Sequence, residues 1–238
     1  MTVVVRGVIL AAGEGSRLAA AYAQPKPLVQ INGVPLAFRT IDALMGAGVS
    51  EVGVVVGYER ALVREEIGRH PLARQIRFID NPEWREPNGL SLRLAQAFTG
   101  EEGFILSMVD HVFDPMIVRR LLQEPPLDGV TLAVDRDLDR VFDMDDATKV
   151  ALDAAGNIRS ISKQLDRFDA VDCGLFRCSP RIYEALDLAF ASGERAVSAG
   201  MQVLADEGRM RAMPVDGLYW QDVDTPEMFA EAERWLTR

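Results

Sequence analysis

Apolar runs that cover both faces of an extended chain recur through the first half of the sequence. Because helices cover both faces of a parallel sheet, such runs are typical of buried parallel strands. Between them, apolar residues recur every three to four positions, which indicates helices. The predicted strands are Val3–Leu10, Val52–Val56, Arg77–Ile79 and Phe104–Met108, and the predicted helices are Leu36–Met45, Ala61–Arg69, Ser91–Ala97 and Met116–Leu122. This alternation predicts an α/β fold with a Rossmann-like, doubly wound sheet.

The rhythm changes after Pro125 and Pro126, where strand candidates become shorter. We expect strands over Gly129–Val134, Lys149–Leu152, Ile158–Ile161 and Ala170–Phe176, and helices over Arg181–Ala189 and Ala196–Glu207. This half is predicted to be a smaller α+β unit that makes the sheet mixed. At 238 residues we expect a single domain over 1–238, with halves of about 1–125 and 126–238.

Composition narrows the class of protein. Hydrophobic residues make up 48% and charged residues 26%, which suits a globular core and excludes disordered and fibrous classes. The net charge of −10 repels phosphate backbones, so nucleic acid is not an expected partner. Two cysteines and two histidines do not make a zinc site. With no secretory signal and no apolar run of roughly 18 residues, we expect a cytoplasmic protein without a membrane span.

The strongest local motif directly follows the first predicted strand. Glycines at that junction let backbone N–H groups approach a phosphate, and Arg17 adds further donors. The motif lacks the third glycine of the dinucleotide fingerprint and the Gly-Lys-Ser/Thr ending of the P-loop. It predicts an anion cradle, although a tight strand-to-helix turn would explain the two glycines equally well. Its residues are Leu10, Ala11, Ala12, Gly13, Glu14, Gly15, Ser16 and Arg17.

A second basic residue follows nine positions later. Lys26 stands between Pro25 and Pro27, which restrict the backbone on both sides. A stiff loop of this kind presents the ammonium as a point charge, so Arg17 and Lys26 are predicted to flank one phosphate site. An ordinary exposed lysine remains the alternative.

Three aspartates are candidate ligands of a magnesium ion. Asp110 follows a buried strand, at the end of the sheet where open α/β proteins bind ligands. Asp222 and Asp224 precede a helix predicted to begin at Thr225 and Pro226. Since Mg²⁺ takes one or two protein carboxylates, Asp110 and Asp222 suffice. We expect Asp224 to cap the helix or to support the site, with a metal role as its alternative.

Six aspartates crowd the segment 135–146. The segment lacks the central glycine and closing glutamate of a calcium loop. A solvated acidic loop is the expectation from charge patterning, with contact to metal or substrate as the alternative.

Together these motifs resemble the sugar-phosphate nucleotidyltransferases. The resemblance is carried, in order, by 10–17, by Pro25-Lys26-Pro27-Leu28, by Asp110 and by Trp220-x-Asp222-x-x-Thr225-Pro226. Within the family, the sequence is most similar to CTP:inositol-1-phosphate cytidylyltransferases, through Asn81-Pro82, Asn88-Gly89-Leu90-Ser91-Leu92, Val109-Asp110-His111-Val112, Thr148-Lys149-Val150, Ser162-Lys163 and Asp172-Cys173-Gly174-Leu175-Phe176. Ser16 stands where threonine is common. The membrane transferase that often follows this domain is absent, which leaves a functional link to a separate membrane partner open.

The resemblance implies a role for each candidate. The first half would bind a nucleoside triphosphate, with its phosphates on the Gly13–Arg17 loop and Lys26 and with Mg²⁺ between Asp110 and Asp222. The second half would bind a phosphorylated small molecule. Arg17 and Lys26 would be the catalytic residues; the nucleobase would meet Asn81, Asn88, Gly89 and Ser91, and the acceptor would meet Lys163, Lys149 and Asp172.

The expected reaction is attack of the acceptor phosphate on the α-phosphorus of the nucleotide, with release of pyrophosphate. The resemblance implies CTP as the nucleotide and inositol 1-phosphate as the acceptor. A phosphomonoester is already ionised near pH 7, so no general base is needed. Three alternatives remain open from the sequence: UTP or dTTP with a sugar 1-phosphate, CTP with phosphocholine or a phosphonate, and a regulatory protein that binds nucleotides without turnover.

Overall fold

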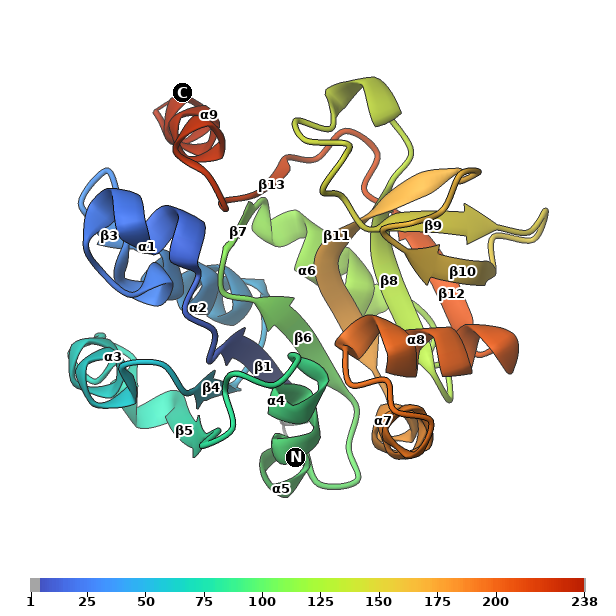
Figure 1. The fold of residues 1–238 in the computed structure, drawn as a ribbon, viewed down its shortest axis with the longest axis horizontal. Coiled ribbons are helices and arrows are strands. Elements are labelled where there is room, and N and C mark those ends of the chain that lie inside the picture. The colour runs from blue at the N-terminus through green and yellow to red at the C-terminus, as the bar shows by residue number, and fades with distance from the viewer. Residues whose placement is uncertain (1–4, 238) are drawn as a thin grey trace.

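A computed structural model describes residues 5–237, apart from the side chains of Ala19 and Ala20, and within them one nine-stranded mixed sheet forms the centre of the molecule (Figure 1). In spatial order its strands are β10 (Ile158–Ser162), β9 (Lys149–Leu152), β11 (Ala170–Cys178), β6 (Phe104–Met108), β1 (Arg6–Ala11), β4 (Glu51–Val56) and β5 (Ile76–Asp80); β8 (Val130–Asp135) pairs with β11, and β12 (Met210–Pro214) pairs with β8. Strands β6, β1, β4 and β5 are parallel, and β11 runs antiparallel to β6. The predicted α/β class with a mixed sheet is confirmed.

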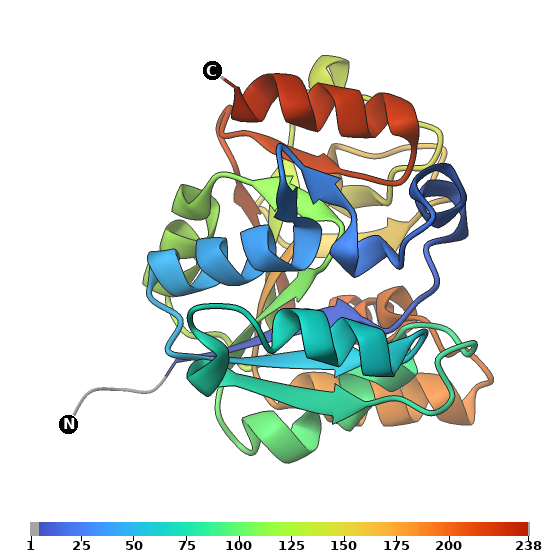
Figure 2. The same cartoon turned by 90° about the vertical axis from the view of Figure 1, so that its left-hand side faces the viewer.

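Helices cover both faces of this sheet, as Figure 2 shows with the blue helix α2 above the strands and green and orange helices below them. One face carries α2 (Leu36–Ala47), α3 (Arg60–Ile67) and α6 (Pro115–Gln123); the other carries α4 (Gly89–Leu94), α5 (Gln96–Thr99), α7 (Arg181–Ala191) and α8 (Val197–Asp206). Strand β1 supplies both cores, because side chains alternate along a strand. Val8 and Leu10 enter one core, and Ile9 and Ala11 enter the other.

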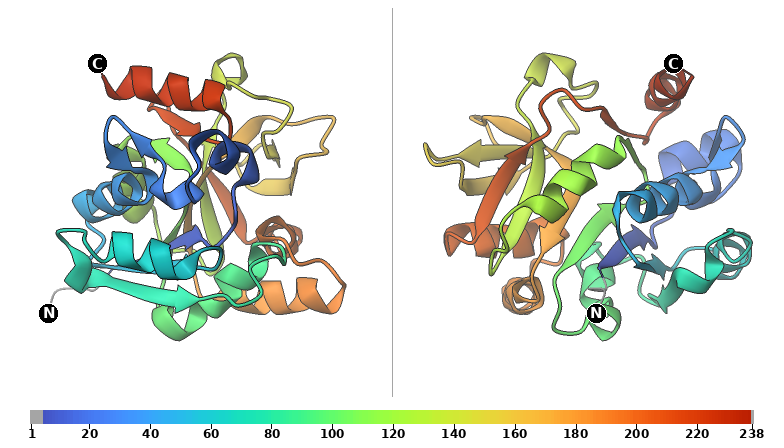
Figure 3. Two further views of the ribbon diagram at one scale, coloured as in Figure 1. Left: turned by 60° about the vertical axis from the view of Figure 1, so that its left-hand side comes forward. Right: turned by 180° about the vertical axis from the view of Figure 1, so that it is seen from behind.

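A smaller layer lies at the end of the sheet where the parallel strands finish. It consists of α1 (Ser16–Tyr22), β2 (Gln30–Ile31), β3 (Val34–Pro35), β7 (His111–Phe113), β13 (Trp220–Asp222) and α9 (Pro226–Leu236). Its core includes Leu18, Val112, Val223 and Phe229, and the ring of Phe229 stacks on Tyr22 at 4.7 Å. Figure 3 shows α9 close to α1 although they stand at opposite ends of the chain. Their contact brings Asp222 and Asp224, which precede α9, to the glycine loop.

Most predicted elements coincide with observed ones, and β6 and β9 have the expected bounds. Val3 and Val4, at the start of the first predicted strand, lie outside the described residues. The predicted helix Ser91–Ala97 is two short helices that meet at Ala95. Within residues 5–237, none of the helices has the length and apolar character needed to cross a membrane.

The expected capping role of Asp224 is wrong. Helix α9 begins at Pro226, and the residue before it, Thr225, accepts a hydrogen bond from Met228 N through Oγ1 at 3.3 Å. Proline at the first helical position places the cap one residue later than Asp224. The Asp224 carboxylate therefore remains available for other partners.

We expect Thr225→Ala to lower the free energy of unfolding by about 0.5–2 kcal/mol, because a backbone donor at the start of α9 loses its acceptor. Thr225→Ser keeps the hydroxyl and should stay near wild type. Urea unfolding of the three proteins measures the difference, and equal stability of the alanine and serine variants would contradict the assigned cap.

Candidate active site

The site lies where the C-terminal ends of the parallel strands meet β7 and β13. Strand β13 pairs antiparallel with β7 and places Asp222 opposite His111. The N–H of Val223 also donates to the backbone oxygen of Asp110 at 2.8 Å. Two segments more than a hundred residues apart thus bring Asp110, Asp222 and Asp224 together, at the edge where open α/β sheets bind ligands.

Lys26 lies at the centre of these aspartates. It begins a 3₁₀ helix (Lys26–Leu28) and is only 6% exposed, so the alternative of an ordinary exposed lysine is wrong. Its Nζ donates to Asp110 Oδ2 at 2.7 Å and to Asp224 Oδ1. Burial lowers the pKa of Lys26, but the charges of Asp110 and Asp224 outweigh this effect and raise the pKa above its ordinary value. The ammonium therefore stays charged.

Gly15 joins the glycine loop to Lys26. Its φ of 61° lies in the left-handed region, and a Cβ at this position would approach the Lys26 Cβ and Cδ to 2.6 Å. Only glycine meets both requirements without strain. The glycine loop and the Lys26 loop, which were predicted to flank one phosphate site, are thus in direct contact.

Asp110 is held from both sides. Its Oδ2 accepts from Lys26, and its Oδ1 pairs with His111 Nδ1 at 2.6 Å. Burial raises the pKa of Asp110, but Lys26 and His111 outweigh it and hold the pKa well below its usual range. For His111, burial lowers the pKa, while the bond to Asp110 raises it more. Gly174, with φ of 71°, leaves room for the His111 ring, which a Cβ there would overlap.

Asp222 is the third carboxylate of the site, beside Asp110 and Asp224. Burial raises its pKa, His111 opposes this, and the charges of Asp110 and Asp224 raise the pKa further. Its Oδ1 accepts a hydrogen bond from Gln221 Nε2 at 3.0 Å. A cation near Asp110 and Asp222 would relieve their mutual repulsion.

These carboxylates fit a magnesium ion. Residues 5–237 contain no ready-made group of three or more His, Cys, Asp or Glu ligands. Mg²⁺ needs no such group, since one or two carboxylates with water and substrate phosphate complete its six positions. Asp110 and Asp222 supply hard oxygen donors, and Asp224 is a third candidate already paired with Lys26.

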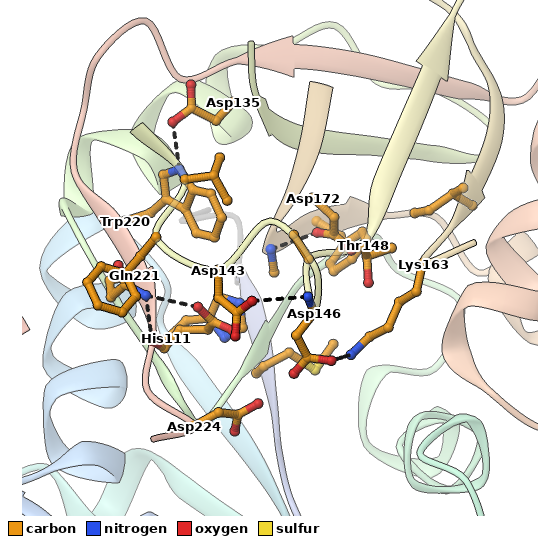
Figure 4. Close-up of a pocket in the computed structure, with 18 of the residues that line it drawn as sticks. His111, Asp135, Asp143, Asp146, Thr148, Lys163, Asp172, Trp220, Gln221 and Asp224 are labelled. Atoms are coloured by element: carbon orange, nitrogen blue, oxygen red, sulfur yellow. Dashed lines mark hydrogen bonds and ion pairs between the residues drawn. The ribbon is translucent and has the colours of Figure 1, made fainter. Parts of the chain in front are cut away.

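A cavity of about 960 Å³ opens beside the aspartates, between the acidic segment, β10, β11 and the C-terminal segment (Figure 4). Lys163 and Asp172, two of the residues predicted to bind the acceptor, both line it. The Asp172 carboxylate accepts from Gly174 N at 2.7 Å, and burial raises its pKa to about 6. Lys149 has a different position: its Nζ donates to the backbone oxygen of Lys163 at 2.9 Å and so supports that residue.

The side chains expected to read the nucleobase are engaged within the protein. Asn81 is fully buried, donates to Ser91 Oγ at 2.9 Å and accepts from Glu83 N at 2.9 Å. Asn88 accepts from Val197 N at 3.0 Å, at the start of α8. The side chains of Asn81 and Ser91 therefore brace the loop 81–91, and contact of this loop with a nucleobase stays a prediction.

The residues of the glycine loop differ in their exposure to solvent. Leu10, Ala11 and Ala12 are buried at the end of β1, whereas Gly13, Glu14 and Ser16 are exposed. The exposed part begins where the strand ends, so its backbone donors are accessible to a ligand.

Gly89 N donates to Arg195 O at 3.1 Å and leaves no room for a side chain.

Sequence reasoning missed two aspartates of the acidic segment. Asp146 accepts a hydrogen bond from Arg17 Nη2 at 2.8 Å, and the same nitrogen donates to Asp224 Oδ2 at 2.9 Å. Asp135 is buried and accepts from Trp220 Nε1 at 2.8 Å. Because both partners lie far away in the sequence, a charge pattern could not separate these residues from their solvated neighbours.

The sequence profile of the MobA-like NTP transferase domain matches residues 7–142. The chain belongs to this family. That assignment confirms the resemblance to nucleotidyltransferases, and the matched residues include the glycine loop, Lys26 and Asp110.

Individual relatives agree with the family. The chain is 36% identical over 228 residues to the "Bifunctional IPC transferase and DIPP synthase" of Rubrobacter xylanophilus, covering 94% of this chain and 50% of that protein. It is 33% identical to the "CMP-5'-(3-aminopropyl)phosphonate synthase" of Streptomyces rubellomurinus, over 93% of this chain and 37% of that protein. The chain thus spans about half, or less, of the curated relatives it matches here.

The fold agrees with the solved structure of the inositol-1-phosphate CTP transferase from T. maritima. The TM-score is 0.85 at 21% identity, over 98% of this chain and 97% of that chain. At this identity the likeness shows the fold alone.

Removing the Lys26 ammonium should affect stability as well as activity. We expect Lys26→Met to lower the free energy of unfolding by about 1–3 kcal/mol, because Asp110 and Asp224 lose their partner in a largely buried place. Adding Asp224→Asn should recover part of this loss without restoring turnover. Urea unfolding and initial rates for the single and double variants measure both effects. A single variant as stable as wild type would contradict the buried ion pair.

The raised pKa of Asp172 predicts a stability that depends on pH. An unfolded aspartate ionises near pH 4, whereas folded Asp172 ionises near pH 6. Between these values the unfolded state loses its proton first, so folding stability falls as pH rises, by about 2–3 kcal/mol in all. Asp172→Asn keeps an acceptor for Gly174 N and abolishes this loss. Unfolding at pH 4.5 and 8 should show the variant gaining relative to wild type at pH 8, while the exposed-site control Asp145→Asn shows no such gain.

Proposed function

We propose that the chain is a nucleotidyltransferase that joins CTP to inositol 1-phosphate and releases pyrophosphate. The observation that carries the proposal is the buried Lys26 ammonium, held by Asp110 and Asp224 and packed against Gly15. One cation, a glycine loop and a set of carboxylates thus meet at the end of a parallel sheet. This combination suits the alignment of a triphosphate more than any other common ligand.

The chain's residues divide between the two substrates. Backbone N–H groups of the 13–17 loop, Arg17 and Lys26 bind the triphosphate in the first half, and Lys163 and Asp172 bind the acceptor in the second. An acceptor phosphate oxygen forms a bond to the α-phosphorus as the bond to the pyrophosphate oxygen breaks. Alignment and neutralised charge supply the rate, and no residue has to remove a proton.

Mg²⁺ is the proposed cofactor, held by Asp110 and Asp222. When bound, the ion neutralises charge on the phosphates and the leaving group. Lys26 keeps Asp110 ionised, which is the form a metal requires.

The choice of CTP and inositol 1-phosphate is supported by the names of the IPC transferase relative and of the T. maritima transferase. The Streptomyces relative favours one second candidate, an aminoalkylphosphonate acceptor with CTP. The DIPP synthase activity named for the Rubrobacter protein is not proposed for this chain, which spans half of that protein. We also propose a cytoplasmic location and a functional link to a membrane transferase that uses the product.

A pyrophosphate-release screen tests the substrates. The four ribonucleoside triphosphates and dTTP are paired with inositol 1-phosphate, glucose 1-phosphate, phosphocholine and 2-aminoethylphosphonate. We expect CTP with inositol 1-phosphate to exceed other pairs by at least about tenfold, because one reversed donor–acceptor pair on a base suffices for that discrimination. Fastest turnover with an aminoalkylphosphonate would establish the second candidate, and no turnover with any pair would favour a regulatory protein.

The same assay tests the metal. Activity should vanish with EDTA and return with Mg²⁺, and Asp222→Asn should require more Mg²⁺ for half-maximal rate, because the carboxylate charge is lost. Mg²⁺ binding measured directly by calorimetry should weaken in parallel. If Asp224→Asn alone shifts the titration, Asp224 and not Asp222 is the second ligand.

A further inference from the structure

One aspartate of the acidic segment contacts both halves of the site. Asp146 lies in the connection between β8 and β9. Its Oδ2 accepts a hydrogen bond from Arg17 Nη2 at 2.8 Å. Through Oδ1 it accepts from Lys163 Nζ at 2.5 Å. Figure 4 shows its carboxylate directed at Lys163 inside the cavity. A single side chain therefore joins the cation proposed for the triphosphate to the cation proposed for the acceptor phosphate.

A carboxylate and a phosphate compete for such cations, because both offer oxygen atoms to the same N–H donors. The Arg17 Nη2 atom already donates hydrogen bonds to both Asp146 and Asp224. Lys163 has its Nζ on Asp146 while its backbone oxygen is held by Lys149. A phosphate that binds either cation therefore competes with the Asp146 carboxylate for that cation's charge and N–H donors.

We propose that Asp146 couples nucleotide binding to acceptor binding, an inference that rests on the function proposed above. Either substrate phosphate frees Asp146 from one cation and removes one of the two ion pairs that hold the Asp146 carboxylate. The two ion pairs share the conformational entropy that is lost when the Asp146 side chain is ordered, so the pair that remains bears this loss alone and is easier to break when the second substrate binds. The coupling is positive, and by thermodynamic reciprocity each substrate tightens the other by the same factor.

The exposure of the ion pairs sets the size of the effect. The side chains of Arg17 and Lys163 are 54% and 51% exposed, and that of Asp146 is 28% exposed. Ion pairs so open to water are weak individually, so the expected coupling is about three- to tenfold and not all-or-none. Asp146 is thus a positioning residue that acts through Arg17 and Lys163.

Calorimetry on the full chain measures the coupling. The titrant is a CTP analogue with a methylene bridge between the α- and β-phosphates, with Mg²⁺ present, without and with saturating inositol 1-phosphate or the acceptor that the screen selects. In wild type the acceptor should lower the Kd of the analogue about three- to tenfold. In Asp146→Asn, which keeps the shape and loses the charge, the analogue should bind tightly without acceptor, and the factor should fall to about one.

Asp145→Asn is the matched control, because Asp145 is the exposed neighbour and its loss changes the net charge equally. It should retain the wild-type coupling. Equal coupling in wild type and Asp146→Asn would overturn the inference, as would a wild type that binds the two ligands independently. Failure of the proposed function looks different: wild type would release no pyrophosphate and bind no analogue, and the inference would fall with it.

Discussion

The arrangement of the site depends on one constraint, the neutralisation of a buried ammonium group. Lys26 is almost inaccessible to water, and a buried charge is tolerated only when it is paired and hydrogen-bonded. Its two partners, Asp110 and Asp224, come from the middle and the end of the chain. Folding must therefore bring α9 and β13 onto the N-terminal half of the chain. Stacking of Tyr22 on Phe229 and the β7–β13 pair supply the apolar contacts and backbone hydrogen bonds that hold this junction.

An acidic protein can bind an anion only where its cations gather locally. The net charge of −10 opposes anion binding in general, but Arg17, Lys26 and Lys163 all face one region. Each is paired with an aspartate, which keeps the cations in place and makes their release dependent on a competing oxyanion. In this MobA-like NTP transferase domain, the surrounding carboxylates hold the cations in place, and their oxygen atoms are of the type that Mg²⁺ prefers.

The core of the fold could be predicted because it rests on local patterns. Continuous apolar runs gave β4 and β6 nearly residue by residue, since a strand buried on both faces leaves no polar alternation. Short elements such as β2, β3 and β7 were not predicted, because two or three residues carry no periodicity. The cap of α9 was misplaced by one residue, since both Asp224 and Thr225 are good capping residues and only the backbone of the folded helix distinguishes them.

The sequence by itself determined the alternation of strands and helices, the glycine loop after β1 and the candidate charges Arg17, Lys26, Asp110, Asp222 and Asp224, because residue type and short spacing carry that information. Only the tertiary structure decided which charges meet. The pairing of Lys26 with Asp224, the bridge of Asp146 to Arg17 and Lys163, and the mutual bond of Asn81 and Ser91 all depend on folded geometry. Electrostatic and hydrogen-bond energies fall off within a few ångströms, so residues far apart in sequence interact only after the hydrophobic core has set their distances.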